Sequence, residues 1–263
     1  MKLKFLELKD NYAKILFEET APYFVNAIRR TLIADIPKLA IETVTIYDNT
    51  SALFDEIIAH RLGMIPLPTR LDLLNFRKDC VCKGKGCPNC TVHYHLSKEG
   101  ECVVYSGDLV PEDPMWAVVD DKIPIVKLHK NQRLILEAEA ELGIGRDHAK
   151  WQVVCGIGYK YYPVIEIDAE KCNLCNACVE ACPRNILEIK KRKLIIKNVE
   201  DCILCKSCME VCKRNAIKVK GDETRIIMQY ETDGSMSAKD ALKEALKILH
   251  KKYDELEEKL GLK

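Results

Sequence analysis

The sequence predicts an α+β fold built from more than one compact unit. Its 263 residues suit two or three domains at roughly 100–200 residues each. Alternating apolar and polar side chains predict strands near both ends of the chain, and a regularly spaced apolar row predicts a long helix over 238–260. Eight of the 14 cysteines fall within residues 170–221, where the composition changes, so this segment is predicted to be a separate small domain.

The N-terminal region predicts a hairpin followed by a helix. Apolar residues alternate with polar ones over residues 2–18, on both sides of a turn at Asp10-Asn11. Thr20 is a suitable N-cap, and Pro22 falls in the first turn of the helix that follows. Further strands are expected over 41–47 and 223–231. The apolar stripe of the first helix consists of Phe24, Ala27, Ile28 and Leu32.

The C-terminal helix has the clearest periodicity in the chain. Ser237 is its expected N-cap, and six large residues follow at spacings of 4, 3, 4, 3 and 4, as in the a and d positions of a coiled coil. An apolar row of this size usually marks an interface, although most amphipathic helices pack onto their own domain. We therefore expect this row and the first helix to form a partner interface. The row is Leu242, Leu246, Leu249, Tyr253, Leu256 and Leu260.

Composition argues against two classes of protein. The chain has 41 Lys and Arg against 40 Asp and Glu, so it lacks the basic excess of a nucleic-acid-binding protein. No direct DNA binding is therefore expected. The N-terminus has no apolar signal-like run, and no stretch approaches the ~18 apolar residues of a membrane span. We expect a cytoplasmic protein, whose cysteines are more suited to metal ligation than to disulfides.

A cysteine pattern occurs twice, thirty residues apart. Each copy reads C-x2-C-x2-C-x3-C, beginning at Cys172 and at Cys202. Three cysteines at this spacing can reach three corners of a cubane iron–sulfur cluster from one tight loop, and in two-cluster ferredoxins the fourth cysteine ligates the other cluster. Zinc sites or disulfides are the alternatives. Pro183 follows the first copy as the pattern requires, whereas Lys213 follows the second.

Residues 166–222 therefore resemble a ferredoxin-like domain with two [4Fe-4S] clusters. The predicted ligands are Cys172, Cys175, Cys178 and Cys212 for the first cluster, and Cys202, Cys205, Cys208 and Cys182 for the second.

A third group of cysteines lies at residues 80–90. Cys80, Cys82, Cys87 and Cys90 offer four thiolates within eleven residues, and glycines between the pairs permit a tight turn. Four thiolates are a usual ligand set for structural zinc. The alternatives are unliganded thiols, or His93 or His95 in place of one cysteine.

The remaining signals predict no catalytic site. The Gly143-x-Gly145 and Gly156-x-Gly158 pairs lack the third glycine of a dinucleotide fingerprint and are expected to be turns. His60 and His148 are expected to be structural. The two remaining cysteines, Cys102 and Cys155, are expected to be small buried residues.

Four segments of the chain carry a distinctive pattern. They are residues 24–32, FVNAIRRTL, residues 59–67, AHRLGMIPL, residues 146–151, RDHAKW, with the later Tyr161-Tyr-Pro163, and Asp233-Gly-Ser235 before the last helix. The first segment resembles the first helix of the alpha-like subunits of cellular RNA polymerases, and the next two resemble parts of their inserted domain. Together with the ferredoxin-like insertion, the chain resembles the archaeal D branch of that family.

The resemblance implies an architecture and a set of partners. Residues 1–45 and 223–263 would form a discontinuous dimerisation domain, and residues 46–165 an inserted α+β domain with the four-cysteine loop. The family implies a non-catalytic scaffold of DNA-directed RNA polymerase that pairs with subunit L. With subunits N and P, this pair carries the large catalytic subunits. Eukaryotic relatives have a zinc loop like 80–90, with one residue fewer between the second and third cysteines.

The ferredoxin pattern also allows a different function. A chain with two cluster motifs could be the electron-transfer subunit of an oxidoreductase. The roughly 200 surrounding residues carry no flavin or nicotinamide signature, and they include the polymerase-like segments. The sequence therefore favours the scaffold, in which the clusters would be mainly structural and could make assembly sensitive to oxidation.

Overall fold

The computed structural model describes residues 1–261 and divides into two compact units. The first unit consists of Met1–Glu7, Lys14–Ala27 and Ile157–Gln229, and the second of Leu8–Ala13, Ile28–Gly156 and Tyr230–Lys263. The three predicted domains, 1–45 with 223–263, 46–165 and 166–222, stay a prediction, and residues 262 and 263 lie outside the described ones. Within residues 1–261, no helix is long and apolar enough to cross a membrane.

Both ends of the chain supply strands to one four-stranded sheet, in the order β1-β2-β12-β9. The predicted N-terminal hairpin is confirmed, and its second strand buries Ala13, Ile15 and Phe17 on alternate positions. The predicted strand at 223–231 is part of a longer one, in which Ile226, Met228 and Tyr230 are buried. The strands are β1 (Lys2–Leu8), β2 (Tyr12–Glu18), β9 (Val154–Ile167) and β12 (Ile217–Thr232).

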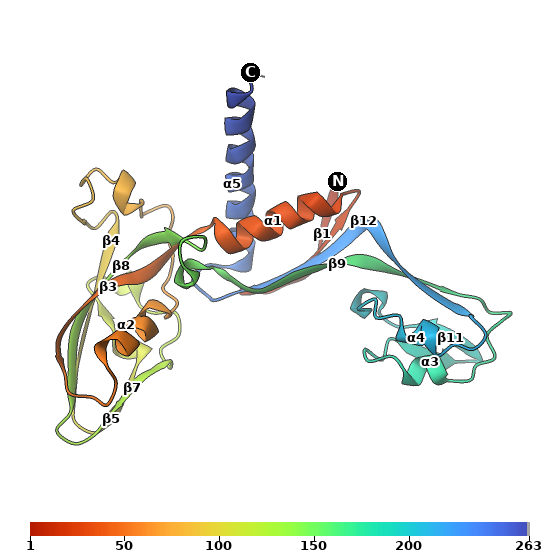
Figure 1. Ribbon diagram of the computed structural model, residues 1–263, viewed down its shortest axis with the longest axis horizontal. Helices are drawn as coiled ribbons and strands as arrows, with labels where there is room; N and C mark the ends of the chain where they lie inside the picture. Colours follow the sequence, from red (N-terminus) through yellow and green to blue (C-terminus); the bar gives the residue numbers. More distant parts are fainter. Residues whose placement is uncertain (262–263) are drawn as a thin grey trace. The chain divides into compact units, whose positions relative to one another are not determined.

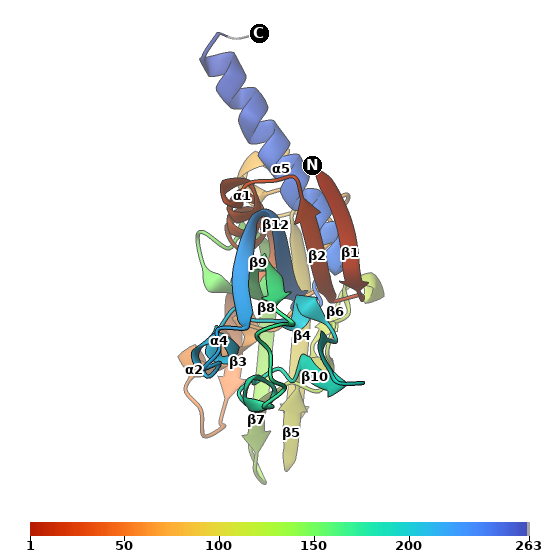
Figure 2. The same cartoon turned by 90° about the vertical axis from the view of Figure 1, so that its right-hand side faces the viewer.

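The second unit is built on another antiparallel sheet, in the order β3-β8-β4-β6. Its three long strands run side by side in both views (Figures 1 and 2). Two register shifts in β3 bend the strand. Helix α2 and the β5–β7 ladder complete the core. The bounds are β3 (Pro37–Asn49), α2 (Asp55–Gly63), β4 (Thr91–Glu99), β5 (Cys102–Tyr105), β6 (Val110–Pro111), β7 (Pro124–Leu128) and β8 (Arg133–Ile144).

Two longer helices are α1 (Pro22–Ala34) and α5 (Ala238–Lys259). The predicted cap of α5 is confirmed, because the Ser237 hydroxyl accepts a hydrogen bond of 3.1 Å from the Asp240 amide. Only the first two turns of α5 are buried, through Ala238, Ala241, Leu242 and Ala245. The rest of the helix is mostly exposed, although Lys252 forms an ion pair of 2.6 Å with Asp35 of the same unit (Figure 1).

The cysteine repeats fold into two matching short helices and a small hairpin in the first unit. Their core is formed by five buried residues, Ile186, Leu187, Cys202, Ile217 and Val219, with other cysteines of both repeats packed against it. The elements are α3 (Ala177–Glu180), β10 (Leu187–Lys190), β11 (Lys193–Ile196) and α4 (Ser207–Glu210).

A buried ion pair ties β3 to the turn before α5 within the second unit. Lys38 is only 5% exposed at its side chain, where it contacts Asp233 and donates to the Gln152 carbonyl at 3.3 Å. Asp233 also accepts hydrogen bonds from the Ser235 amide at 3.0 Å and hydroxyl at 2.6 Å. Gly234 between them has a φ of +92°, which favours glycine. The Asp-Gly-Ser segment is thus a structural turn closed by a lysine.

Replacing Asp233 with Ala should destabilise the second unit by about 3–5 kcal/mol, because it leaves the Lys38 ammonium buried without its carboxylate. Urea unfolding followed by tryptophan fluorescence measures this, since both tryptophans, Trp116 and Trp151, lie in that unit. The control is Lys247→Ala, which removes an exposed pair with Glu244 and should change stability by less than about 1 kcal/mol. Equal effects would contradict the prediction.

Candidate metal centres

The two cysteine repeats share a backbone conformation as well as a spacing. Equivalent residues adopt positive φ in both copies, at 59° and 60° for Leu174 and Leu204, and at 67° and 64° for Asn176 and Lys206. These left-handed positions turn the chain tightly between the first and third cysteines and precede the short helices α3 and α4. The repeat seen in the sequence is therefore a repeat of local structure.

Two cavities in this part of the first unit each gather three cysteines of one repeat and one of the other. The larger, of about 340 Å³, is lined by Cys172, Cys175, Cys178 and Cys212. The smaller, of about 20 Å³, is lined by Cys182, Cys202, Cys205 and Cys208. These are the two sets expected if the last cysteine of each repeat serves the other cluster.

The chemistry of these donors fits a cationic metal core. All 14 cysteines are free thiols, so no disulfide competes for them. Burial and the neighbouring thiols, Cys202 first among them, raise the pKa of Cys208 to about 11. A thiol in this environment stays protonated at neutral pH unless a positive charge compensates its thiolate, and the iron atoms of a cluster would supply that charge.

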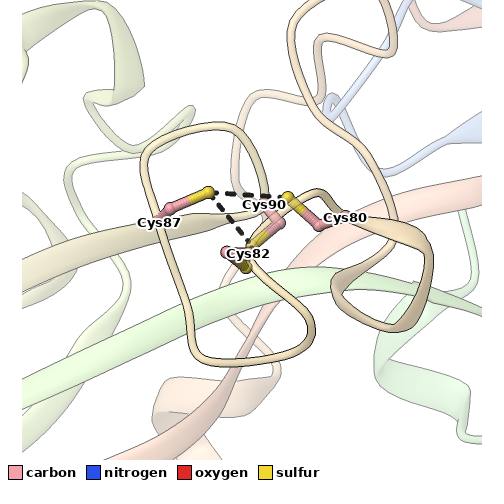
Figure 3. A group of neighbouring side chains, drawn as sticks. All are labelled: Cys80, Cys82, Cys87 and Cys90. Carbon is pink, nitrogen blue, oxygen red and sulfur yellow. Dashed lines mark hydrogen bonds between the residues drawn. The ribbon is translucent and has the colours of Figure 1, made fainter.

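The third cysteine group, at residues 80–90, has a much tighter geometry. The Sγ–Sγ distances are 3.5 Å for Cys80 and Cys87, 3.6 Å for Cys82 and Cys90, and 3.8 Å for Cys87 and Cys90. Figure 3 shows the four thiols facing one another. Among the described residues, this is the one group whose ligand atoms all lie within 4.8 Å of each other, and neither His93 nor His95 belongs to it.

These distances fit one tetrahedral zinc ion. Four sulfurs at about 2.3 Å from a central zinc stand about 3.8 Å from one another. The eight repeat cysteines form no group this close, which suits a cubane, since its iron atoms stand between the sulfurs. The spacing of the sulfur atoms therefore distinguishes the four-cysteine group at residues 80–90 from the cysteines of the two repeats.

Local backbone geometry preorganises the four-cysteine loop. Lys83, Gly84 and Gly86 have φ values of 54°, 81° and 90°, and the Lys83 amide donates to the Cys80 carbonyl at 2.9 Å. Although burial raises the pKa of Cys82, hydrogen bonds from the Cys90 thiol and the Gly86 amide lower it to about 6. These hydrogen bonds therefore favour the thiolate form of Cys82.

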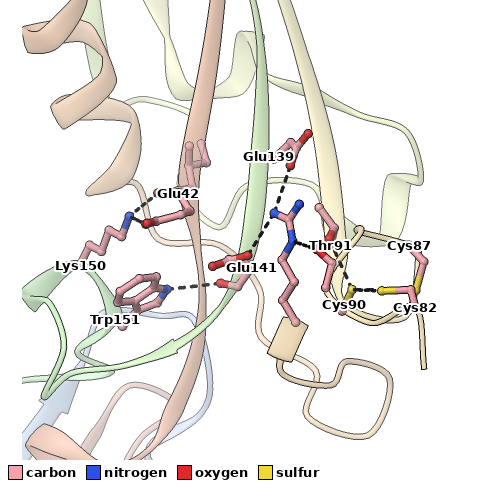
Figure 4. A network of polar contacts seen from close by, with 12 residues as sticks. Glu42, Cys82, Cys87, Cys90, Thr91, Glu139, Glu141, Lys150 and Trp151 are labelled. Carbon is pink, nitrogen blue, oxygen red and sulfur yellow. Dashed lines mark hydrogen bonds and ion pairs between the residues drawn. The ribbon is translucent and has the colours of Figure 1, made fainter. Parts of the chain in front are cut away.

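Arg77 is a supporting residue that the sequence did not reveal. Its Nε donates to the Gly84 carbonyl at 3.0 Å, and one terminal nitrogen lies 3.4 Å from Glu139 and 3.3 Å from Glu141 on β8. Figure 4 shows these two carboxylates beside the cysteine loop, with the Trp151 indole donating to the Glu141 carbonyl. The guanidinium thus ties the loop to the sheet.

Three further residues discussed from the sequence are His148, Cys102 and Cys155, and the prediction fails for the last of them. His148 is structural as expected, because its Nδ1 accepts a hydrogen bond of 3.1 Å from the Lys150 amide. Cys102 is partly buried against the core of the second unit. The prediction for Cys155 is wrong, because this residue is exposed on β9.

Two family models match the chain. The RNA polymerase Rpb3/RpoA insert domain covers residues 42–169, and the 4Fe-4S dicluster domain covers residues 164–213.

Curated relatives match nearly the whole length. DNA-directed RNA polymerase subunit Rpo3 of Archaeoglobus fulgidus is 43% identical over 97% of this chain and 96% of its own length. Rpo3 of Methanothermobacter thermautotrophicus is 46% identical over 89% of each chain, and that of Pyrobaculum neutrophilum is 37% identical over 95% of this chain and 92% of its own. The chain belongs to the Rpo3 family of archaeal RNA polymerase subunits. The resemblance predicted from the sequence is confirmed, as is the α+β fold class.

Membership of the Rpo3 family decides between the functions that the sequence left open. The chain is an RNA polymerase assembly subunit that is not catalytic by itself, and the oxidoreductase alternative is not favoured. The match to a 4Fe-4S dicluster domain also favours iron–sulfur binding over zinc in the repeats.

The predicted interface residues of this Rpo3 chain divide into buried and exposed ones. Ile28, Leu32 and Leu242 are 1%, 0% and 5% exposed, so the expectation that they offer a free surface is corrected: their side chains are used within the chain. Phe24 and Leu249 are half-buried. Four residues of the α5 row remain exposed, namely Leu246, Tyr253, Leu256 and Leu260.

Replacing Arg77 with Ala should loosen the four-cysteine loop in metal-free protein. The loss of its hydrogen bonds removes about 1–2 kcal/mol of local stability, so the Lys83 and Lys85 amides should exchange about tenfold faster with deuterium. The control is Arg133→Ala, which removes the ion pair with Asp48 in the same unit. Exchange that is unchanged in Arg77→Ala, or equally faster in the control, would contradict the role of Arg77.

Proposed function

We propose that this chain is a scaffold that pairs with the smaller alpha-like subunit L through the C-terminal helix. The pair, with subunits N and P, would form the platform on which the large catalytic subunits of archaeal RNA polymerase assemble in the cytoplasm. The observation that carries the proposal is the exposed apolar row on α5 in a chain that matches Rpo3 over its whole length.

The outer turns of α5 are unusually apolar for a solvated surface. Leu246, Tyr253, Leu256 and Leu260 are 39%, 51%, 50% and 61% exposed, and their 3-4 spacing places them along one side of the helix. Each large apolar side chain gains roughly 1.5–3 kcal/mol when it is fully buried. A helix of the partner packed along this row would supply that burial, as in the a and d seam of a coiled coil.

Helix α1 contributes less to this proposed interface than its sequence suggested. Phe24 keeps part of its surface accessible, whereas Ile28 and Leu32 are already covered. We therefore assign the main contact to the outer half of α5 and a smaller one to the start of α1.

The double variant Tyr253→Glu with Leu256→Glu should abolish association with subunit L, since it places two carboxylates in the apolar row. Co-expression and size-exclusion chromatography measure the pairing. The matched control is Lys251→Glu, which adds negative charge on the opposite side of the helix and should keep association within about twofold of wild type. A double variant that still binds L would refute the assignment of the interface to α5.

We also propose that the chain binds two [4Fe-4S] clusters and one zinc ion as structural cofactors. The two thiol cavities support the clusters, and the four close sulfurs at residues 80–90 support zinc. Metal–thiolate bonds can stabilise small domains whose apolar core is limited, and the core of the cluster region has only five buried residues.

Anaerobically purified protein should contain eight iron atoms, at four per cluster, and one zinc ion. Replacing Cys87 with Ser should remove the zinc and leave the iron, because it breaks the four-sulfur set. The control Cys102→Ser lies in the same unit and should keep both metals. Measurement is by elemental analysis. Loss of iron in Cys87→Ser, or zinc retained in it at full occupancy, would contradict the assignment.

A further part of the proposal is that cluster loss weakens polymerase assembly, which would make assembly sensitive to oxidation. Cys205 is exposed, and a hydrogen bond from the Ser207 hydroxyl lowers its pKa, so this thiol would be open to attack once its cluster is lost. The double variant Cys202→Ser with Cys205→Ser should give less assembled polymerase than wild type in reconstitution from subunits. Unchanged assembly would remove this part of the proposal.

A further inference from the structure

Two lysines of the β1-β2-β12-β9 sheet hold the loop that begins the second cysteine repeat. Lys160 of β9 donates its Nζ to the Glu200 carbonyl at 2.6 Å and to the Cys202 carbonyl at 2.7 Å. Lys14 of β2 forms an ion pair with Asp201 at 3.3 Å. All five residues belong to the first unit. The two lysines therefore hold residues 200–202 from two strands of the same sheet.

The loop presents carbonyl groups that need such a donor. Val199–Asp201 is a single 3₁₀ turn that ends at Cys202, and the last carbonyls of a helical turn have no partner within it. Lysine near the C-terminal end of a turn satisfies these carbonyls and interacts favourably with their dipoles. Lys160 is half-buried, so its charge acts through a region of low dielectric.

Among the described residues, no lysine side chain donates a hydrogen bond to the carbonyl of Cys172, the corresponding cysteine of the first repeat. There the Cys172 amide donates to the Asp168 carbonyl at 3.1 Å, and the nearby Lys171 is paired with the Asp168 carboxylate at 2.8 Å. The Lys171 side chain is 62% exposed, so water also screens it. In the second repeat Asp201 pairs with Lys14, which leaves the charge of Lys160 directed at backbone carbonyls.

We propose that Lys160 positions the Cys202 loop and raises the reduction potential of the second cluster. The inference rests on the proposed occupancy of the two cavities. Net charge and hydrogen bonding are among the factors that set cluster potentials. Since a reduced cluster has one more negative charge than an oxidised one, a half-buried cation beside a ligand cysteine favours reduction.

The experiment is a redox titration of the full-length chain with dithionite, followed by electron paramagnetic resonance. Each cluster takes up one electron from the titrant, and no bond to a ligand forms or breaks. The double variant Cys172→Ser with Cys175→Ser isolates the second cluster, and Cys202→Ser with Cys205→Ser isolates the first. Lys160→Met is then introduced into each of these two proteins, and Lys160→Arg tests rescue of the charge.

Lys160→Met should shift the midpoint potential of the second cluster to a more negative value and leave the first unchanged. Lys160→Arg should restore the wild-type value. The control Lys4→Met removes an exposed lysine on β1 of the same unit and should move neither potential. An unchanged second-cluster potential in Lys160→Met, or an equal shift in both clusters, would overturn the inference.

Iron content separates this inference from the cluster proposal. If the parent protein lacks iron in the second cavity, the cluster proposal itself fails. If only Lys160→Met loses that iron while Lys160→Arg keeps it, the positioning role is supported. The midpoint potential of the second cluster is then measured in Lys160→Gln, which retains a hydrogen-bond donor without the charge. Iron lost equally in Lys160→Met and Lys160→Arg would overturn the inference.

Discussion

The hydrogen-bonded pairing of β2 with β12 is the interaction on which the rest of this chain depends. It brings residues from both ends of the sequence into one sheet. The pairing is extended by backbone hydrogen bonds from Thr20 to Thr224 at 3.1 Å and from Thr232 to Asn11 at 2.9 Å. Contacts between residues so far apart in the sequence carry a loop-closure cost in entropy, and order in the chain between them reduces that cost.

The loop-closure cost explains in structural terms why the chain between these strands would benefit from metal-ligating cysteines. The cluster region has few buried apolar residues of its own, and it is attached through the long strands β9 and β12. Thiol ligands that are satisfied by a metal would stabilise this segment where apolar burial cannot. The four-cysteine loop follows the same logic on a smaller scale, since Arg77 and Glu141 connect it to the sheet of the second unit.

The sequence predicted local features well and distant pairings poorly. The hairpin, the α5 cap and the cysteine spacings depend on residues within about ten positions of each other, where periodicity and turn chemistry are informative. Lys38 with Asp233 and Lys160 with Cys202 are partners 195 and 42 residues apart, and no local pattern marks them. The sequence predicted the apolar stripe of α1. A stripe alone does not distinguish packing of Ile28 within its own chain from packing against a partner subunit. Cys155 was misplaced because a lone cysteine has no pattern that reports its exposure.

We infer that the outer half of α5 is covered only in the assembled enzyme. Hydrogen exchange of the amides from Tyr253 to Lys259, measured in the isolated chain and in the assembled polymerase, tests it most directly, because it reports protection without altering a residue. We expect fast exchange in the isolated chain and protection of at least about a hundredfold in the polymerase, which corresponds to roughly 2.7 kcal/mol. Equal exchange in the two states would contradict it.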